Sequence, residues 1–166
     1  MNKQEIYEFF DAAGIWYEVT EHKAVYNMEE ASMLEMPYPE ADAKNLFVRE
    51  DKKRGYHLIT LRGSGRLDLK AFRRQNGTRS LSFASEAELM DILGLIPGAV
   101  SPLGLLNDHE FRAKFWLDRS FLDPPGLIGI HPNDGYIDNR MLAQFPGVLG
   151  QNLSILREHG TQVSLF

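Results

Sequence analysis

The fifteen residues Gly94–Asp108 combine glycine and proline with apolar side chains in a pattern that suits contact with a small polar ligand. They read G-L-I-P-G-A-V-S-P-L-G-L-L-N-D and contain three glycines and two prolines. Glycine lets a ligand approach the main chain closely, and proline fixes φ and lacks an N–H group. Two interpretations stay open: a backbone wall that presents N–H donors to a ligand, or a buried strand with glycines at its ends. The residues that would line such a wall are Gly98, Ala99, Val100, Ser101 and Pro102.

Three further side chains lie where strands are expected to begin or end. Lys44 and Asn45 stand at the start of an apolar run, Leu46–Val48, and His131 follows another, Leu127–Ile130. A lysine in this position can hold a phosphate or polarise a carbonyl, and a histidine can exchange a proton near neutral pH. Each residue also has a purely structural interpretation, as a solvated edge lysine, a turn-forming asparagine or a hydrogen-bonded turn histidine.

Basic residues gather across an expected loop and the helix that follows it. Clusters of this kind bind the phosphates of nucleic acids, but they are equally typical of a solvated helix face balanced by neighbouring acids. The net charge of −5 argues against a protein that binds nucleic acid over most of its surface, but it still permits a local basic patch. The cluster consists of Arg62, Arg66, Lys70, Arg73 and Arg74.

Several classes of site are excluded by what the sequence lacks. Without cysteine there can be no disulfide, thiolate metal site or cysteine nucleophile. The five histidines show neither H-x-x-x-H spacing nor an H-E-x-x-H motif, and no P-loop, G-x-G-x-x-G or G-x-S-x-G motif occurs, so we predict no metal and no cofactor. No apolar run approaches the about 20 residues that span a bilayer, and the first residues are polar. We therefore expect a soluble, cytoplasmic protein with no membrane partner.

The elements that must position these residues mix helices and strands without strict alternation. Apolar periodicity, capping boxes and glycine stops predict the helices, and short apolar runs between turn residues predict the strands. This order favours a single α+β domain over residues 1–166, with a mixed, barrel-like sheet surrounded by helices. The expected helices cover residues 3–13, 27–34, 68–75, 85–93 and 149–159, and the expected strands cover 15–20, 45–49, 56–61, 81–83, 114–117, 127–130 and 162–165.

Three motifs in this order resemble a known family. They are K-N-L-F-V-R at Lys44–Arg49, the glycine- and proline-containing segment Gly94–Asp108, and G-I-H-P at Gly129–Pro132. Together they resemble the YbaK/ProX family, free-standing relatives of the editing insertion domain of bacterial prolyl-tRNA synthetase. The resemblance covers nearly all of the chain from the first helix to His131, and it implies the fold of that editing domain.

The resemblance also implies an activity and roles for residues. Family members hydrolyse the ester of mischarged aminoacyl-tRNA, and the K-N-L-F and P-G-x-V-S-P motifs are similar to the ProX branch, which clears alanine from tRNA for proline. By the same resemblance Lys44 is the essential lysine, Asn45 its neighbour and His131 the pocket histidine, with Gly98–Pro102 as the pocket loop. The basic cluster would meet the acceptor end of the tRNA, and a ribose hydroxyl of the tRNA would assist water in place of a catalytic triad.

The sequence departs from the family after His131. Family members run through Asn and Thr residues at this point, whereas this chain has N-D-G-Y-I-D at Asn133–Asp138 and an inserted F-P-G at Phe145–Gly147. The departure leaves one alternative open, a non-catalytic module that binds aminoacyl-tRNA or a synthetase, prolyl-tRNA synthetase among them. A separate alternative is a deacylase for another small amino acid such as cysteine or serine.

Overall fold

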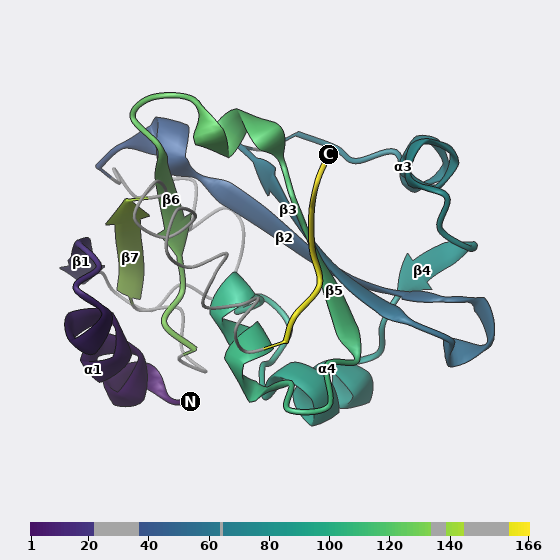
Figure 1. The fold of residues 1–166 in the computed structure, drawn as a ribbon, viewed down its shortest axis with the longest axis horizontal. Helices are drawn as coiled ribbons and strands as arrows, with labels where there is room; N and C mark the ends of the chain where they lie inside the picture. Colours follow the sequence, from purple (N-terminus) through teal and green to yellow (C-terminus); the bar gives the residue numbers. More distant parts are fainter. Residues whose placement is uncertain (22–36, 64, 134–138, 145–159) are drawn as a thin grey trace.

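The computed structural model describes residues 1–21, 37–63, 65–133, 139–144 and 160–166, and the strands within them form two sheets (Figure 1). The larger sheet is mixed, with strand order β4-β2-β3-β5-β8, and the smaller is antiparallel, with order β1-β7-β6. The α+β class and the mixed sheet predicted from the sequence are thereby confirmed. The strands are β1 (Tyr17–Glu21), β2 (Ala43–Glu50), β3 (Tyr56–Arg62), β4 (Leu81–Phe83), β5 (Ala113–Leu117), β6 (Leu127–Ile130), β7 (Asn139–Gln144) and β8 (Val163–Leu165).

The helices begin and end at the residues that local chemistry favours. The helix α1 (Lys3–Ala13) opens with a capping box between Asn2 and Glu5 and ends at Gly14, whose φ is 65°. Asp68 caps α3 (Leu69–Asn76), and a capping box between Ser85 and Glu88 opens α4 (Glu86–Leu93). Four short 3-10 helices complete the described helices: η1 (Pro39–Ala41), η2 (Asp51–Lys53), η3 (Pro102–Asn107) and η4 (Arg119–Leu122).

Some elements differ from the sequence-based predictions. The strand β7 and the 3-10 helix η3 were not predicted. The strand β7 lies in the segment that departs from the family, and η3 covers the second part of the segment Gly94–Asp108, which was interpreted as a wall or a strand. The predicted helices 27–34 and 149–159 lie outside the described residues. None of the helices in the described ranges is long and apolar enough to cross a membrane.

The long β2–β3 hairpin separates two hydrophobic clusters. On one face, Phe47 and Leu58 join the main cluster with α4, η3 and the smaller sheet, and on the other face Val48 and Ile59 pack with Phe72 of α3. Alternation along a strand produces this division, since successive side chains point to opposite faces of a sheet. The hairpin therefore carries side chains to two different environments along its whole length.

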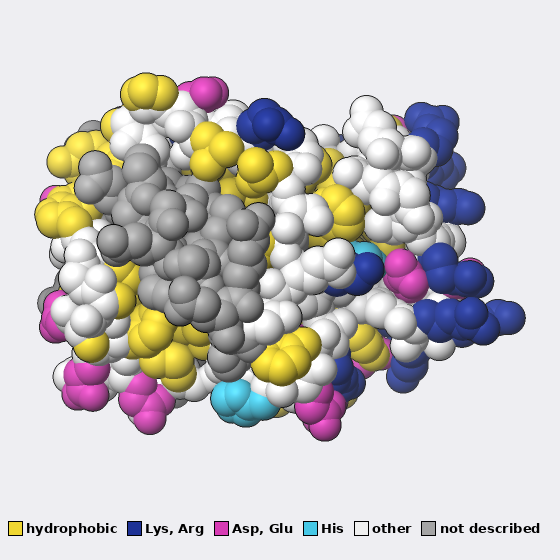
Figure 2. Space-filling model, viewed as in Figure 1, with side chains coloured by type: hydrophobic (Ala, Val, Ile, Leu, Met, Phe, Trp, Pro, Cys, Tyr) yellow, Lys and Arg dark blue, Asp and Glu magenta, His cyan; other side chains and the backbone are white. Residues whose placement is uncertain are grey.

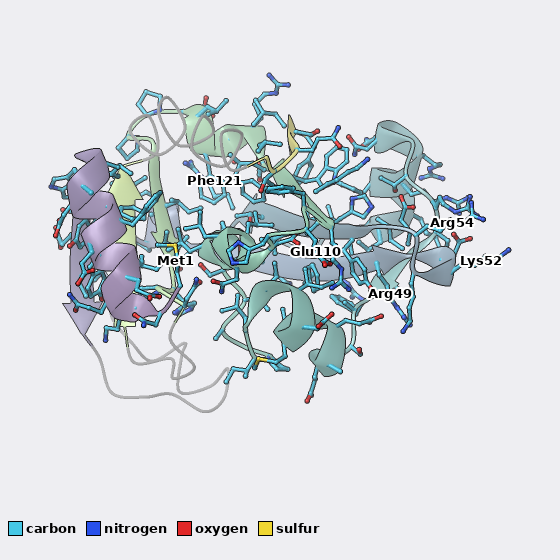
Figure 3. The ribbon with its side chains drawn as sticks, turned by 60° about the horizontal axis from the view of Figure 1, so that its bottom comes forward. Met1, Arg49, Lys52, Arg54, Glu110 and Phe121 are labelled. Carbon is cyan, nitrogen blue, oxygen red and sulfur yellow. The ribbon has the colours of Figure 1, made fainter. Side chains whose placement is uncertain are left out.

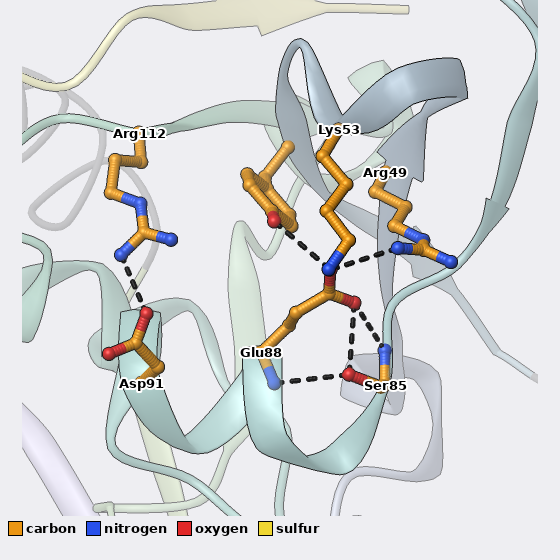
Figure 4. Close-up of polar contacts among 7 residues, drawn as sticks. Arg49, Lys53, Ser85, Glu88, Asp91 and Arg112 are labelled. Carbon is orange, nitrogen blue, oxygen red and sulfur yellow. Dashed lines mark hydrogen bonds and ion pairs between the residues drawn. The ribbon is translucent and has the colours of Figure 1, made fainter.

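Glu88 attaches the helix α4 to the outer part of the hairpin (Figure 4). Its carboxylate accepts hydrogen bonds from Arg49 at 2.9 Å, from the Tyr56 hydroxyl at 3.1 Å, and from the backbone N–H of Ser85 at 2.8 Å, and Lys53 Nζ lies 3.3 Å away. The Ser85 N–H bond is the largest cause that lowers the pKa of Glu88 to about 2, and the hydroxyl and lysine contacts lower it further. Glu88 is 9% exposed, and its carboxylate ties the hairpin to α4.

We expect Glu88→Gln to lower the free energy of unfolding by about 1–3 kcal/mol at neutral pH, because it removes the charge from several hydrogen bonds at once. The pKa of Glu88 is lower in the folded chain than in the unfolded chain, so its contribution is complete above about pH 4.5 and is lost as the pH falls towards 2. The difference between wild type and Glu88→Gln in urea denaturation should therefore shrink over that window. Glu86→Gln, an exposed change in the same helical turn, is the control, and an equal loss in both variants would contradict this role of Glu88.

Candidate functional site

The segment expected to form a backbone wall leads into the 3-10 helix η3. Ser101 is fully buried, its Oγ accepts a hydrogen bond from the Leu103 N–H at 3.3 Å, and its carbonyl oxygen accepts one from the Gly104 N–H at 3.1 Å. Gly104 packs closely, and a side chain there would require Leu95 to move, because a Cβ would lie 2.6 Å from Cδ1 of Leu95. Pro102, at the start of η3, is buried as well.

Only part of the wall offers free donors. The N–H of Ala99 donates to the Ile96 carbonyl oxygen at 3.1 Å, so the expectation that all of residues 98–101 present free N–H groups is wrong for Ala99. The N–H groups of Gly98, Val100 and Ser101 donate to no acceptor within the described residues. Gly98 is exposed, Val100 is half-buried and Ser101 is buried, so these donors extend from the surface inward.

The side-chain amide of Asn45 joins this wall to the central sheet. Its Nδ2 donates to the Val100 carbonyl oxygen at 2.9 Å, and its Oδ1 accepts from the Thr60 hydroxyl at 2.6 Å. A carbonyl oxygen can only accept, so this arrangement fixes which end of the amide faces Val100 and makes Thr60 the donor. Thr60 is fully buried on β3, directly opposite Asn45 in the hairpin register.

The bond from Asn45 also orients the next N–H group. In a trans peptide the carbonyl of one residue and the N–H of the next point in opposite directions. Because the Val100 carbonyl is turned towards Asn45, the Ser101 N–H points away from it, and this buried donor has no acceptor among the described residues. A buried donor without a partner costs about 1–3 kcal/mol, which a bound carbonyl or oxyanion would offset.

Lys44 is adjacent to Asn45 in the chain but lies on the opposite face of the strand. It is four residues from Val48 and so shares the face that α3 covers, whereas Asn45 faces the wall. Lys44 is exposed, and its Nζ lies 3.5 Å from the Gly65 carbonyl oxygen. The two residues therefore stand on either side of the same end of the sheet.

His131 follows β6 directly and is half-buried. Two residues later Asn133, with φ of 51°, donates from Nδ2 to the Leu103 carbonyl oxygen at 3.1 Å. This bond attaches the segment that carries His131 to the same 3-10 helix that follows the wall. Asn133 and Thr60 are the residues that sequence analysis missed. Asn133 stood in the segment that departs from the family, and no motif marks a buried strand threonine.

The buried His57 serves packing. Its Nδ1 accepts a hydrogen bond from Trp116 Nε1 at 2.9 Å, and its Nε2 lies 3.2 Å from a carboxylate oxygen of Glu50. Burial lowers the pKa of His57. Because Nδ1 accepts the Trp116 N–H, it cannot carry a proton itself, and the ring proton is on Nε2. The ring is thus held neutral with both nitrogens engaged, and it is on the face away from the wall.

The residues of the basic cluster predicted from the sequence belong to different elements. The guanidinium of Arg62 lies over the ring of Phe121, with 5.1 Å to the ring centroid, near the end of β3 that pairs with the start of β2. Arg73 and Arg74 belong to the last turn of the helix α3, which follows the loop after β3. Arg66 and Lys70, both exposed, lie between these arginines along the chain.

No group of three or more side chains that could bind a metal ion occurs in the part of the chain that the structure describes. The arrangement around Asn45 instead offers backbone N–H donors beside a hydrogen-bonded side-chain amide. Such groups stabilise negative charge that develops on a carbonyl oxygen. The site can therefore act on an activated carbonyl compound, such as an ester, with water as the nucleophile.

Comparison with known proteins gives one family and several relatives. The family described as "Aminoacyl-tRNA editing domain" matches residues 22–136. The prolyl-tRNA editing protein ProX of Acetoanaerobium sticklandii is 35% identical over 132 residues, which cover 80% of each chain. The prolyl-tRNA synthetase associated domain-containing protein 1 of Bos taurus is 36% identical over 68% of this chain and 66% of that protein. A solved structure of a candidate trans-editing enzyme for prolyl tRNA synthetase has the same fold, with a TM-score of 0.65 and 22% identity over 98% of this chain and 94% of that one.

The role of the Thr60 hydroxyl can be tested without knowledge of a substrate. In Thr60→Val, Asn45 Oδ1 loses its donor within a buried environment, and we expect the free energy of unfolding to fall by about 1–3 kcal/mol. The wall should also loosen, so that the Ala99 N–H exchanges faster with deuterium. Thr60→Ser keeps the hydroxyl and should retain the slow exchange. If Ala99 exchanges at the same rate in all three proteins, the amide of Asn45 does not hold the wall.

Proposed function

Because the chain belongs to the aminoacyl-tRNA editing domain family, we propose that it is a trans-editing deacylase that hydrolyses the ester of mischarged tRNA for proline, with alanine as the amino acid removed. The family membership confirms the resemblance to the YbaK/ProX proteins. One observation carries the proposal: Asn45 holds the wall to the sheet so that the Ser101 N–H, buried and without an acceptor among the described residues, points away from the amide. In this proposal residues 1–166 form a single editing domain.

The reaction needs few groups, because an aminoacyl ester is already activated. A water oxygen attacks the ester carbonyl carbon, the carbonyl oxygen becomes an oxyanion, and the bond to the ribose oxygen then breaks. The amino acid leaves as a carboxylate, and of the two protons of the water one goes to the ribose oxygen and the other to the solvent. The N–H groups of Gly98, Val100 and Ser101 are the donors for the oxyanion. A ribose hydroxyl of the tRNA assists the water, as the family resemblance implies, and neither metal nor cofactor takes part.

Selection for a small amino acid follows from the limits of a synthetase pocket. A pocket sized for proline cannot strongly reject alanine, because the lost apolar contact is worth only about 1–3 kcal/mol. A second, smaller pocket can hydrolyse what the first admits. The wall suits this task, since Ala99 is fully buried and the amide of Asn45 fixes the position of Val100.

Lys44 and His131 act on different parts of the substrate. Lys44, exposed on the face opposite Asn45, holds a phosphate or the ribose of the terminal adenosine, while the ester lies against the wall. His131, attached to η3 through Asn133, lines the amino-acid pocket. The partner is thus the acceptor end of a mischarged tRNA, with prolyl-tRNA synthetase as a further partner.

Two alternatives make different predictions with a panel of mischarged tRNAs. A deacylase for another small amino acid would hydrolyse cysteinyl- or seryl-tRNA faster than alanyl-tRNA for proline. A non-catalytic module would bind the acceptor end without loss of the ester. Measuring ester loss from alanyl-, cysteinyl- and seryl-tRNA at equal concentrations distinguishes all three, and ester loss that stops in EDTA and returns with zinc would contradict the metal-free reaction.

Lys44→Ala should leave the fold intact and lower kcat/KM for alanyl-tRNA. An exposed lysine contributes within about 0.5 kcal/mol to stability, but a charged hydrogen bond to the substrate is worth about 1.5–3 kcal/mol. The expected loss is therefore roughly 10- to 150-fold in single-turnover deacylation. Lys44→Arg should rescue only in part, because a planar guanidinium differs in shape from an ammonium. A folded Lys44→Ala protein that reacts at the wild-type rate would remove Lys44 from the site.

His131→Ala should lower the rate of deacylation or relax the choice of amino acid while the protein remains folded. The histidine lies half-buried at the end of β6, where a change of side chain alters the pocket more than the core. The measurement compares alanyl-, seryl- and prolyl-tRNA as substrates, with circular dichroism as the control for folding. Unchanged rates on all three substrates would leave His131 with a structural role only.

A further inference from the structure

Charge is distributed very unevenly along this chain. Residues 50–54 and 66–80 hold eight of the 18 Lys and Arg residues and only three of the 23 Asp and Glu residues. These two segments therefore carry +5, whereas the whole chain carries −5, so the remaining residues carry −10. An acidic protein that keeps such a positive charge in two short segments concentrates its attraction for anions there.

The fold brings the two segments to one end of the molecule. The strand β4 follows the second segment and pairs with β2, with Leu81 opposite Glu50, and the Asp51 N–H donates to the Ser80 carbonyl oxygen at 2.9 Å. An ion pair between Arg79 and Asp51 joins them further. Figure 2 shows Lys and Arg side chains gathered along this end, over α3 and the tip of the hairpin, and Figure 3 shows Lys52 and Arg54 extending outward from it.

The charges at this end are held in place but not neutralised. Lys53 and Arg79 pair with Glu88 and Asp51, which fixes the hairpin tip against α4 and against the segment before β4. Lys52 and Lys53 have positive φ values of 57° and 53°, a backbone conformation that side chains other than glycine adopt at a cost. Six further basic residues of these two segments form no ion pair within the described part of the chain. One of them, Arg66, lies in the loop before α3, and we refer to the other five as the basic end: Lys52, Arg54, Lys70, Arg73 and Arg74.

The basic end is far from Lys44, but other positively charged residues lie between them. From Lys44 to the hairpin tip at Asp51 the strand β2 advances seven residues, which is about 23 Å at 3.3 Å per residue. Lys44 lies on the face of the sheet that α3 covers, and its Nζ meets the carbonyl oxygen of Gly65, next to Arg66. Positive charge therefore runs from Lys44 through the loop before α3 to the basic end.

We propose that the basic end binds the phosphate backbone of the base-paired arm of the tRNA whose terminal ester reacts near Lys44. The inference rests on the proposed function, and it adds a second contact region that includes the hairpin residues Lys52 and Arg54. A single-stranded terminus at Lys44 separates the paired nucleotides from that lysine, and the basic end begins about 23 Å from Lys44 along β2. Exposed Lys and Arg side chains on a fixed backbone contact phosphates without reading bases, so the recognition is of helical shape and charge.

The test removes the hairpin charges and compares a long substrate with a short one. Lys52→Gln/Arg54→Gln is assayed on full-length alanyl-tRNA for proline and on the alanyl ester of the terminal C-C-A trinucleotide, which cannot reach the basic end. We expect kcat/KM for the full-length substrate to fall about 3- to 30-fold, mostly through a higher KM. This is the size of effect expected when two exposed charge contacts are lost. The slope of log kcat/KM against log salt concentration should become shallower by about 2. Hydrolysis of the short ester should stay within twofold of wild type.

A matched control separates local from overall charge. Arg54→Gln and Lys3→Gln each remove one positive charge, but Lys3 lies on α1 at the other end of the molecule (Figure 1). Only Arg54→Gln should raise KM for full-length tRNA. Thermal unfolding of both variants is the control for folding.

The outcomes distinguish this inference from the proposed function. If wild type hydrolyses neither substrate, the proposed function fails. If wild type hydrolyses both, and Lys52→Gln/Arg54→Gln matches it on full-length tRNA with the same salt slope, the basic end does not bind tRNA and the inference is overturned. Equal losses on the long and the short substrate also overturn it, because the charges would then act on the site itself.

Discussion

The side-chain amide of Asn45 is the interaction on which the candidate site depends. It accepts from the buried Thr60 hydroxyl of β3 and donates to the Val100 carbonyl oxygen, so one side chain links the central sheet to a loop 55 residues further along the chain. Since only one end of an amide can donate to a carbonyl, the bond also sets the direction of the following peptide, and the Ser101 N–H turns away from the sheet. A loop rich in glycine and proline thereby becomes a fixed set of donors, as stabilisation of an oxyanion requires.

The hairpin β2–β3 distributes the parts of the molecule that the proposed reaction needs. At one end Lys44 and Asn45 lie on opposite faces of the sheet, so in the proposed reaction they would hold a terminal nucleotide and its ester from two sides. At the other end Glu88 fixes the hairpin against α4, and the basic end extends from the tip. Alternation along a strand and the length of the hairpin together set this arrangement, in which the basic end is separated from the wall by most of the strand length.

The acidic total charge and the basic end are compatible with one another. An overall charge of −5 weakens non-specific attraction to nucleic acid, while a local charge of +5 over two segments still attracts a phosphate backbone at close range. Such a protein would bind RNA weakly unless the terminus of the RNA contacts the region of Lys44 and a base-paired arm contacts the basic end at the same time. Weak binding of this kind suits an enzyme that must release correctly charged tRNA quickly.

The sequence by itself determined the local structure and the family. Ser85 with Glu88 predicts where α4 begins, and the apolar spacing of residues 3–13 with Gly14 predicts α1 and its end, because capping and periodicity depend on residues a few positions apart. The motifs around Lys44, Gly98 and His131 likewise identified the family. Only the tertiary structure decided that Thr60 supports Asn45, that Ala99 uses its N–H within the loop, and that the Arg62 guanidinium lies over the Phe121 ring. These facts depend on strand register and on contacts between residues far apart in the chain, and neither composition nor local spacing contains that information.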